Sequence, residues 1–335
     1  MRKKPTLLFG VNGMGLGHLT HAYCLYPTLK KYYNVDILVS GLQHENPFDF
    51  PIKYKVNGLR FVYKNGHVCW LSTLKKTTPL ALIKDMKTLD LSPYDLVLTD
   101  FEPISAWAAF FQKKYCIHMS HQASLFYTST PKPNWLSTPI WTQLMKLMAP
   151  SCKKIGFHFK HYTPAIYGPL IKPDLQPKDI TNGDHILVYL SAYSAEEQVT
   201  FFKQFPNNTF QIFHNQFTHK KTINNLTCNP INHTQFKTQM LSCKGFISQA
   251  GFDSIAEVLY LNKPLVVLPI KKQFEQFCNA EALKDLGVLV LKKLQKPAIQ
   301  DWLIQHPIPH TIHPVTPDEL CAAIDTAFKT HNQIS

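Results

Sequence analysis

The stretch that decides the fold runs from Lys244 to Val288, KGFISQAGFDSIAEVLYLNKPLVVLPIKKQFEQFCNAEALKDLGV. Its pattern predicts a strand, a tight loop and a helix, followed by a second strand, loop and helix. A short apolar strand over 245–248 turns sharply at a glycine into the first helix, which Asp253 or Ser254 can cap. The stretch therefore predicts a βαβ unit.

Polar side chains lie at the points where this unit would bind a ligand. A strand that turns sharply into a helix leaves free backbone N–H groups and the positive end of the helix dipole at one place, which suits a phosphate. Glu257 follows one turn into the helix, where a carboxylate can hold ribose hydroxyls. The next loop and helix carry groups suited to sugar hydroxyls: Gln273, Glu275, Gln276 and Asn279.

The stretch resembles the nucleotide-sugar signature of glycosyltransferases with two facing Rossmann-like domains, in Gly251, Ser254, Glu257, Pro269, Gln276 and Asn279. It is similar to the plant and animal UDP-sugar transferases and to the peptidoglycan N-acetylglucosaminyltransferase. The whole chain more closely resembles a bacterial and archaeal glycosyltransferase-like branch. The resemblance implies transfer of a sugar from a nucleotide, UDP by default, with Gln249 and Asp253 also at the donor. Gln249 stands where the plant family has a phosphate-contacting histidine, and Asp253 brings a negative charge near the phosphate.

A glycine loop follows the first predicted strand, Thr6–Val11. Gly13, Gly15 and Gly17 let the backbone approach a ligand closely, and His18 comes directly after them. The spacing is GxGxGH and differs from the GxGxxG dinucleotide fingerprint. No acidic residue ends the second strand and no Walker A lysine follows the glycines, so nicotinamide and ATP are disfavoured.

His18 and Asp100 are the predicted catalytic residues. In the resembling families the position of His18 is a histidine on the acceptor side, and in the plant enzymes it deprotonates the acceptor. A histidine pKa near 6.5 suits that work, whereas helix capping and phosphate binding are the alternatives. Asp100 follows the buried strand Asp95–Thr99 and could orient His18, or it could cap the next helix.

Glu102 is the second candidate for the carboxylate, and His121 follows the next predicted strand. Ligands of open α/β sheets bind at the carboxyl ends of the strands, so both side chains are expected at the cleft. With the three glycines they form the predicted acceptor and phosphate loop.

The expected fold is α/β, with two facing, doubly wound Rossmann-like domains of the GT-B kind. Residues 1–168 would form the acceptor-binding domain and residues 179–317 the nucleotide-sugar domain. The proline-rich segment 169–178 would link them, and the helix over 318–335 would cross back to the first domain.

Four segments are harder to interpret. Leu59–Tyr63 is strand-like and Pro79–Leu89 predicts a helix. Trp135–Met148 is apolar, and a core-packing helix is favoured over a membrane-interface segment because it contains a lysine and a proline. Lys220–Asn232 is polar and expected to be exposed.

The composition narrows the class of protein. The chain has 335 residues, 45% of them hydrophobic, which is enough for two domain cores. Its eight cysteines form no CxxC pair, which favours reduced thiols in the cytoplasm over a disulfide framework or a zinc site. The apolar run at residues 7–11 is too short for a signal peptide. No DxD motif occurs, so we expect neither a metal nor a cofactor, the nucleotide-sugar being a substrate.

The net charge of +13 is unevenly distributed. Residues 1–175 hold 21 basic and 9 acidic residues, against 14 and 13 in residues 176–335. An acidic partner fits the first half: an anionic membrane surface on the cytoplasmic side, or a phosphorylated acceptor. A solvated surface is the alternative, and nucleic acid is disfavoured because no binding motif occurs. The candidate residues are Arg2, Lys3, Lys4, Lys75, Lys76, Lys113, Lys114, Lys153 and Lys154.

The predicted function is inverting, metal-independent transfer of a sugar to an acceptor hydroxyl on a lipid-linked or cell-envelope glycan. Two other interpretations stay open: a nucleotide-sugar epimerase of the same fold, and a non-catalytic protein that binds a nucleotide-sugar or a lipid.

Overall fold

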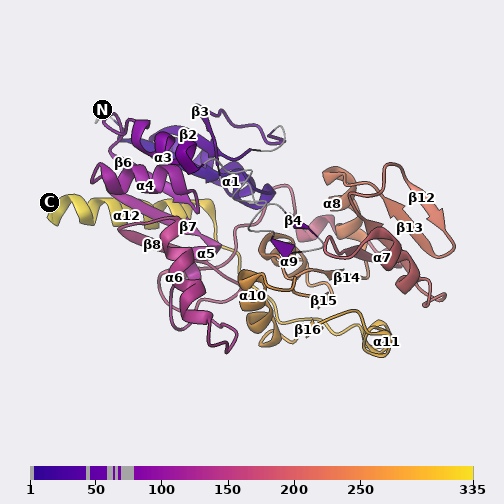
Figure 1. Ribbon diagram of the computed structural model, residues 1–335. Helices are drawn as coiled ribbons and strands as arrows, with labels where there is room; N and C mark the ends of the chain where they lie inside the picture. Colours follow the sequence, from indigo (N-terminus) through magenta and orange to yellow (C-terminus); the bar gives the residue numbers. More distant parts are fainter. Residues whose placement is uncertain (1–3, 43–45, 59–62, 65–66, 69–78, 335) are drawn as a thin grey trace.

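A computed structural model describes residues 4–42, 46–58, 63–64, 67–68 and 79–334. The described chain forms two α/β domains side by side, each with its own parallel-dominated sheet (Figure 1). The predicted fold class is confirmed.

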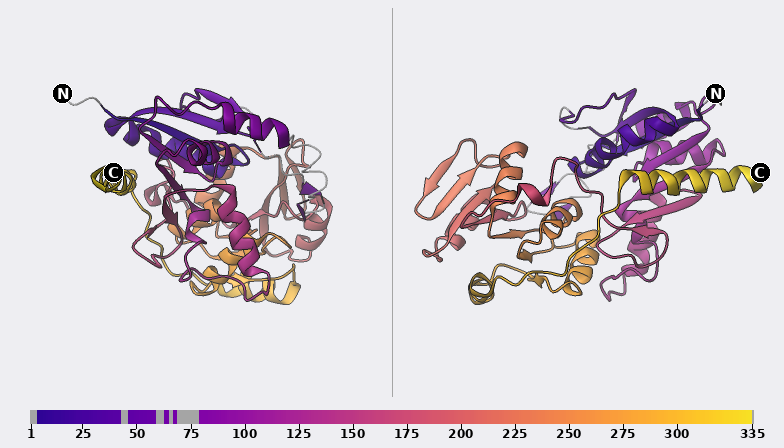
Figure 2. Two further views of the ribbon diagram at one scale, coloured as in Figure 1. Left: turned by 60° about the vertical axis from the view of Figure 1, so that its left-hand side comes forward. Right: turned by 180° about the vertical axis from the view of Figure 1, so that it is seen from behind.

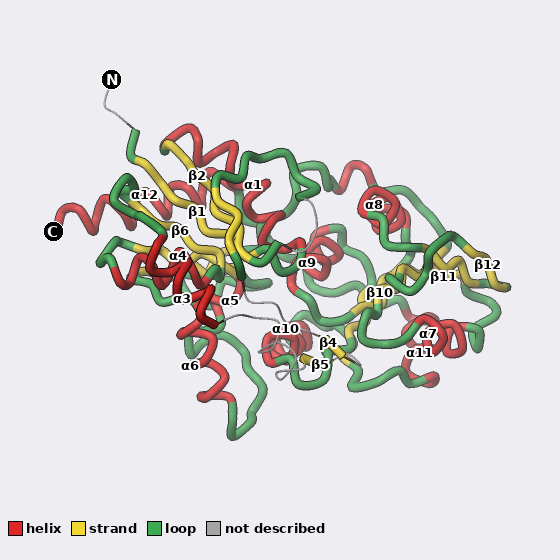
Figure 3. The backbone as a smooth tube through the Cα atoms, turned by 45° about the horizontal axis from the view of Figure 1, so that its top comes forward, coloured by secondary structure: helices red, strands yellow, loops and turns green. Residues whose placement is uncertain are grey.

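The first sheet has seven strands in the order β3-β2-β1-β6-β7-β8-β9, and every neighbouring pair is parallel. Its strands are β1 (Thr6–Asn12), β2 (Asn34–Ser40), β3 (Tyr54–Val56), β6 (Leu96–Asp100), β7 (Cys116–Ser120), β8 (Lys153–Phe157) and β9 (Ile166–Tyr167). Its helices are α1 (Leu16–Tyr32), α3 (Pro79–Thr88), α4 (Pro103–Phe111), α5 (His121–Ser124) and α6 (Thr138–Met148). A separate hairpin joins β4 (Tyr63–Lys64) to β5 (His67–Val68) and is drawn close to the second domain (Figure 3).

The second sheet also has seven strands, in the order β12-β13-β11-β10-β14-β15-β16, and only β12 is antiparallel to its neighbour among the described strands. Its strands are β10 (His185–Tyr189), β11 (Thr209–Phe213), β12 (Lys221–Ile223), β13 (Leu226–Asn229), β14 (Gly245–Ser248), β15 (Leu265–Val267) and β16 (Leu289–Val290). Its helices are α7 (Ala195–Phe202), α8 (His233–Ser242), α9 (Phe252–Tyr260), α10 (Phe274–Lys284) and α11 (Lys296–Gln305), and the short 3-10 turn η1 (Pro177–Asp179) precedes them.

Alternation along the strands explains why helices cover both faces of the first sheet. Successive side chains of a strand point to opposite faces. Leu7 and Phe9 therefore pack in the same cluster as α1, whereas Leu8 packs with the cluster under α3 and α4. Both faces are apolar because a parallel sheet is buried on both sides.

The last helix, α12 (Pro317–Ile334), runs along the first domain (Figure 2). Its Leu320 and Ile324 are fully buried, and the Tyr115 hydroxyl donates to the Ala327 carbonyl at 3.3 Å. Packing of this apolar face ties the end of the chain to the domain with which it begins.

The structure corrects three expectations. α6 contains no fully buried residue, so the expected core-packing helix Trp135–Met148 packs by one face only, through Trp141 and Met145. Within the polar segment Lys220–Asn232, β13 pairs with β11 and buries Leu226. The N-cap of α9 is Gly251, without a side-chain cap. The strand-like stretch before Tyr63 lies outside the described residues.

None of the helices within the described ranges combines the length and the apolar character that crossing a bilayer requires.

Substituting Ile324 in α12 tests how strongly this helix is held. Ile324→Ala leaves a cavity in a fully buried position, so we expect the free energy of unfolding to fall by about 2–4 kcal/mol. Thr326→Ala, on the exposed face of the same helix, should change it by less than about 0.5 kcal/mol. Urea unfolding measures both, and equal effects would contradict the packing described.

Candidate active site

The Asp100 carboxylate, at the end of β6, joins two histidines of α1. Its Oδ1 accepts from His18 Nδ1 and its Oδ2 from His21 Nδ1, each at 2.8 Å. Asp100 and His21 are almost fully buried, whereas the His18 side chain is 13% exposed. The structure therefore brings the two predicted catalytic residues into direct contact and adds His21 to them.

His21 also reaches the second domain. Its Nε2 lies 3.2 Å from Asp253 Oδ1, in the first turn of α9. A Cβ at Gly17 would lie 2.0 Å from Asp253 Oδ2, so the glycine loop needs a residue without a side chain here. The two domains thus meet at the glycine loop, His21 and the start of α9.

These contacts determine the charges of His18, His21 and Asp100. Burial disfavours an imidazolium, but the Asp100 carboxylate outweighs burial and raises the pKa of His18. The pKa of His21 rises to about 10, against burial, because carboxylates face both ring nitrogens. Burial alone would raise the pKa of Asp100, but the two histidines hold it well below its ordinary value. His21 is therefore a cation at neutral pH, bound between two carboxylates.

The loops after β1 and β6 are fixed to each other by Asn12. Its Nδ2 donates to the Phe101 carbonyl at 3.2 Å and its Oδ1 accepts from the Met14 N–H at 2.9 Å. Phe101 has a positive φ of 51°, which is strained for a non-glycine residue, and its ring stacks near His18.

Glycines 13 and 15 serve the same loop in different ways. The Gly13 N–H donates to the Ser40 carbonyl at 2.7 Å, and a Cβ at Gly13 would collide with the backbone of Leu42. Gly15 has φ 92° and is the N-cap of α1. The loop therefore needs glycine for close packing at one position and for its backbone angle at the other.

The N-terminus of α9 is open to a ligand. Gly251 is its N-cap, no side chain caps the helix, and a Cβ at Gly251 would meet nothing within 4 Å. Ser254, in the same turn, is half-buried. Gln249 Oε1 accepts from the N–H and hydroxyl of Ser191, while Gln249 Nε2 is buried without a hydrogen-bond partner. Unpaired donors at a helix N-terminus suit an anion.

Glu257 forms an ion pair across the boundary between the linker and the second domain. Its Oε1 lies 2.9 Å from Lys172 Nζ, and both side chains are largely buried. Burial raises the pKa of Glu257 although Lys172 opposes the shift. The predicted ribose ligand is therefore already held by a lysine that the sequence pattern did not indicate.

The remaining predicted donor residues lie along α10. Gln273 is its N-cap residue, with Oε1 buried and unpartnered, and Gln276 Oε1 accepts from the Ile270 N–H at 2.9 Å. Glu275 Oε2 accepts from Gln122 Nε2 of the first domain at 3.1 Å. Glu275 therefore lies at the domain junction, whereas Gln276 holds the loop before α10.

Asn279 and His121 are paired with each other across the two domains. His121 Nε2 lies 2.7 Å from Asn279 Oδ1 and its Nδ1 3.0 Å from the Phe157 carbonyl. Asn279 Nδ2 donates to the Ala250 carbonyl, and the His121 ring stacks on Phe252 at 3.8 Å. Both side chains are buried, so the structure places them in the domain contact and not on an open cleft surface.

Glu102 caps α4. Its carboxylate accepts from the backbone N–H groups of Ile104 at 2.8 Å and Ser105 at 2.6 Å, and it is fully buried. The structure thus separates the two carboxylates: Asp100 faces the histidines, and the expected role of Glu102 at the cleft is replaced by helix capping.

Three ligand-type groups lie close enough to hold a metal ion. The ligand atoms of His18, His21 and Asp100 all lie within 4.8 Å of one another. Both imidazole–carboxylate distances are 2.8 Å, however, which is a hydrogen-bond separation. Shared protons account for this geometry without an ion.

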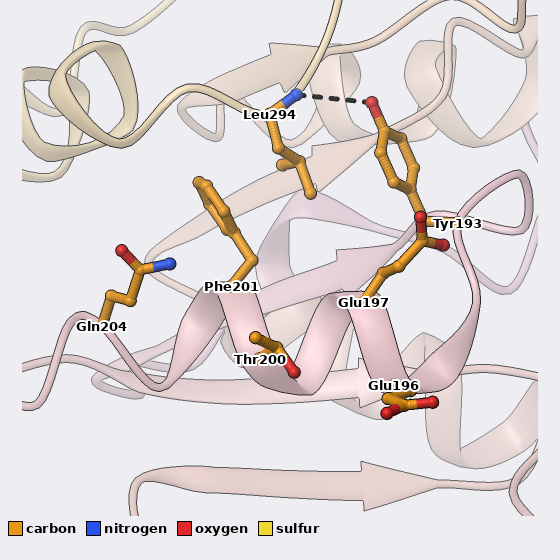
Figure 4. Close-up of a pocket in the computed structure, with 7 residues that line it drawn as sticks. All are labelled: Tyr193, Glu196, Glu197, Thr200, Phe201, Gln204 and Leu294. Atoms are coloured by element: carbon orange, nitrogen blue, oxygen red, sulfur yellow. Dashed lines mark hydrogen bonds between the residues drawn. The ribbon is translucent and has the colours of Figure 1, made fainter.

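A shallow cavity of about 420 Å³ lies elsewhere, on α7 of the second domain (Figure 4). Glu196, Glu197 and Phe201 line it from the helix, and the Leu294 N–H donates to the Tyr193 hydroxyl at 3.3 Å. It contains none of the predicted site residues.

The main residue that the sequence analysis missed is His21. It lies three positions after His18, and residues at this spacing share a helix face, so the motif GHLTH carries a signal for it. Lys172, within the proline-rich linker, has no comparable signal.

Two facing Rossmann-like domains, with a His–Asp pair on one and an uncapped helix N-terminus opposite, have the arrangement of the GT-B fold class. The chain belongs to glycosyl transferase family 1, whose sequence profile matches residues 5–307. It is therefore a glycosyltransferase. A comparison with curated proteins finds no match.

Solved structures share the fold. MurG of Acinetobacter baumannii has a TM-score of 0.59 and 14% identity, over 97% of this chain and 100% of that one. Arabidopsis thaliana UGT89C1, complexed with UDP-L-rhamnose, has a TM-score of 0.61 and 11% identity, over 90% of each chain. The spinosyn forosaminyltransferase SpnP has a TM-score of 0.59 and 10% identity, over 98% and 100%. At these identities the likeness supports the two-domain fold.

The charge of His21 makes stability depend on pH. Its pKa is about 10 in the folded chain and 6.5 in the unfolded chain, so its contribution is complete below pH 6.5 and is lost as pH rises toward 10. Between pH 6.5 and 9.5 we expect the free energy of unfolding to fall by about 2–4 kcal/mol more in the wild type than in His21→Gln. Urea unfolding across this range measures the difference, and parallel curves would mean that His21 is neutral.

Proposed function

We propose that the chain transfers a sugar from a nucleotide-sugar, UDP-linked by preference, to an acceptor hydroxyl with inversion at the anomeric carbon. The observation that carries the proposal is the 2.8 Å contact between His18 and Asp100, placed where the first domain meets the N-terminus of α9. Family membership supports sugar transfer, and the solved complexes of Arabidopsis UGT89C1 with UDP-L-rhamnose and of Phytolacca americana UGT2 with UDP-2-fluoroglucose support the choice of UDP.

His18 is the proposed general base. Nδ1 donates to Asp100, so Nε2 is the nitrogen that takes the acceptor proton. The acceptor oxygen forms a bond to the anomeric carbon as the bond from that carbon to the diphosphate oxygen breaks. The charge of the imidazolium formed is balanced by Asp100, which is ionised at neutral pH.

The leaving diphosphate would be stabilised at α9. The uncapped N–H groups after Gly251, the Ser254 hydroxyl and the unpaired Nε2 of Gln249 are the proposed donors, in place of a metal ion. Glu257 would hold the ribose, sharing its carboxylate with Lys172. Asp253 opposes the phosphate charge unless His21 neutralises it, so the His21–Asp253 contact is part of the proposal.

The sugar would lie against α10. Glu275, which is half-buried, and Gln273, whose Oε1 has no hydrogen-bond partner, are the proposed ligands of the sugar hydroxyls. Gln276 and Asn279 would position the backbone around them. The acceptor is proposed to be a lipid-linked or cell-envelope glycan, reached at the cytoplasmic face of a membrane.

Product analysis tests the reaction itself. Incubation with a set of nucleotide-sugars and acceptor glycans should release nucleoside diphosphate only when both substrates are present, and proton NMR should show the inverted anomer. Conversion of the donor without any acceptor would instead identify an epimerase, and a protein that binds but never turns over would be a binding module.

Removing the base should affect turnover and not donor binding. His18→Ala should lower kcat by roughly 10²–10⁴, the usual contribution of a general base, while the affinity for UDP is kept. His219→Ala, an exposed histidine of the second domain, is the matched control. Native turnover in His18→Ala would remove both His18 and Asp100 from the mechanism.

Removing the ribose ligand should affect binding. Glu257→Ala loses a charged hydrogen bond, so calorimetry should give a UDP affinity weaker by about 1–3 kcal/mol. Glu281→Ala, which breaks the surface pair with Lys284 on α10, should leave the affinity unchanged. An unchanged affinity in a folded Glu257→Ala protein would contradict the assignment.

A further inference from the structure

α6 has an apolar face that no part of the described chain covers. Trp141 and Met145 pack inward against a small apolar cluster of Leu125, Phe274 and Cys278. The outward face carries Ile140, Leu144 and Leu147, whose exposure ranges from 48% to 62%, and Leu136 just before the helix is fully exposed. Residues three, four and seven apart share one helix face, so these side chains form a continuous stripe.

Aromatic residues of α4 extend this stripe. Trp107 Nε1 donates to the Leu147 carbonyl at 3.0 Å, which joins the middle of α4 to the end of α6. Trp107 lies 5.5 Å from Phe110 and 5.6 Å from Phe111 between ring centroids, and both phenylalanines are at least half exposed. We define the docking face as Phe110, Phe111, Leu136, Ile140, Leu144 and Leu147; α6 and α4 are adjacent at one side of the first domain (Figure 1).

The segment of chain that carries the docking face is rich in lysine. Between Glu102 and Asp174 the chain has no acidic residue and eight lysines. Lys113 follows Phe111 by two residues, Lys146 neighbours Leu147, and Lys153 begins β8 shortly after α6. The nearby carboxylate of Asp90 interacts electrostatically with Lys114, and it accepts hydrogen bonds from the N–H and the hydroxyl of Ser92.

We propose that the docking face binds the surface of an anionic bilayer. Exposed aliphatic and aromatic side chains enter the interfacial region, and lysines beside them contact lipid phosphates. A second copy of this face would bring lysines against lysines, and a nucleic acid would supply phosphates but no apolar medium for Ile140 and Leu144. Of the basic residues suggested by the sequence, Lys113 follows the end of α4 and Lys153 begins β8 after α6, so these two are the proposed lipid-phosphate contacts. Arg2, Lys3, Lys75 and Lys76 lie outside the described residues.

The inference deepens the proposed function, and rests on it only for the lipid-linked acceptor. Docking through α6 would hold the first domain, which carries His18, against the membrane. Vesicle binding requires no turnover, so docking and sugar transfer can succeed or fail separately.

The test is co-sedimentation of the full chain with vesicles of phosphatidylcholine alone or mixed with phosphatidylglycerol, at low and high salt. We expect binding to the anionic vesicles that weakens with salt. Ile140→Ser with Leu144→Ser should weaken it at least tenfold, whereas Ile304→Ser with Ile308→Ser, two exposed apolar residues of the second domain, should not. Lys113→Gln with Lys153→Gln should cost roughly fivefold for each lysine, against no loss for Lys220→Gln with Lys221→Gln.

Each other outcome has a defined meaning. Equal partition onto neutral and anionic vesicles, or none onto either, would overturn the proposal. Light scattering that detects a dimer, dissociated by the Ile140 and Leu144 substitutions, would assign the face to a second copy. Displacement from vesicles by RNA, with RNA affinity lost in the lysine variant, would assign it to nucleic acid. Calorimetry with UDP on the same variants measures the donor site separately. Absence of UDP binding would contradict the proposed function and would not bear on membrane docking.

Discussion

The structure depends on one buried carboxylate. Asp100 lies at the end of a central strand with no exposed surface, and burial of an unpaired charge would be costly. His18 and His21 each donate a hydrogen bond to one of its two oxygens at 2.8 Å. These two histidines lower the pKa of Asp100 and keep the carboxylate ionised. The pairing requires β1, β6 and α1 in one arrangement, because each supplies or positions one of the groups. A catalytic pair and a structural ion pair are therefore built around the same side chain.

His21 connects the buried Asp100 to the second domain. Its second nitrogen faces Asp253 at the start of α9, where the diphosphate is proposed to bind. A carboxylate at this position would repel a phosphate, and the positive charge of His21 offsets that repulsion. Gly17 leaves room for Asp253, and the contacts of His121 with Asn279 and Phe252 hold the same two surfaces together. The domain junction and the proposed reaction site are thus one set of contacts.

Much of the fold could be predicted because its signals are local. The first strand and helix of the Lys244–Val288 stretch follow from an apolar run and a glycine turn, and the structure has β14 and α9 there. The pairing of His18 with Asp100 was predictable from topology, since loops at the carboxyl ends of neighbouring parallel strands meet. The sequence does not show which carboxylate caps α4, because Asp100 and Glu102 both precede this helix. The exposure of α6 was not predictable either: apolar spacing predicts a helix face but does not determine whether another element covers it. His21 and Lys172 act through contacts 79 and 85 residues away in the chain, beyond the reach of a local pattern.

The most direct measurement of the central claim is the pH titration of the His18 and His21 imidazole nitrogens by ¹⁵N NMR, in the wild type and in Asp100→Asn. The account predicts that His18 titrates above 6.5 and that His21 stays doubly protonated until about pH 10, with both values falling in the variant. Titration of both histidines near 6.5 in the wild type, or identical curves in the two proteins, would contradict it.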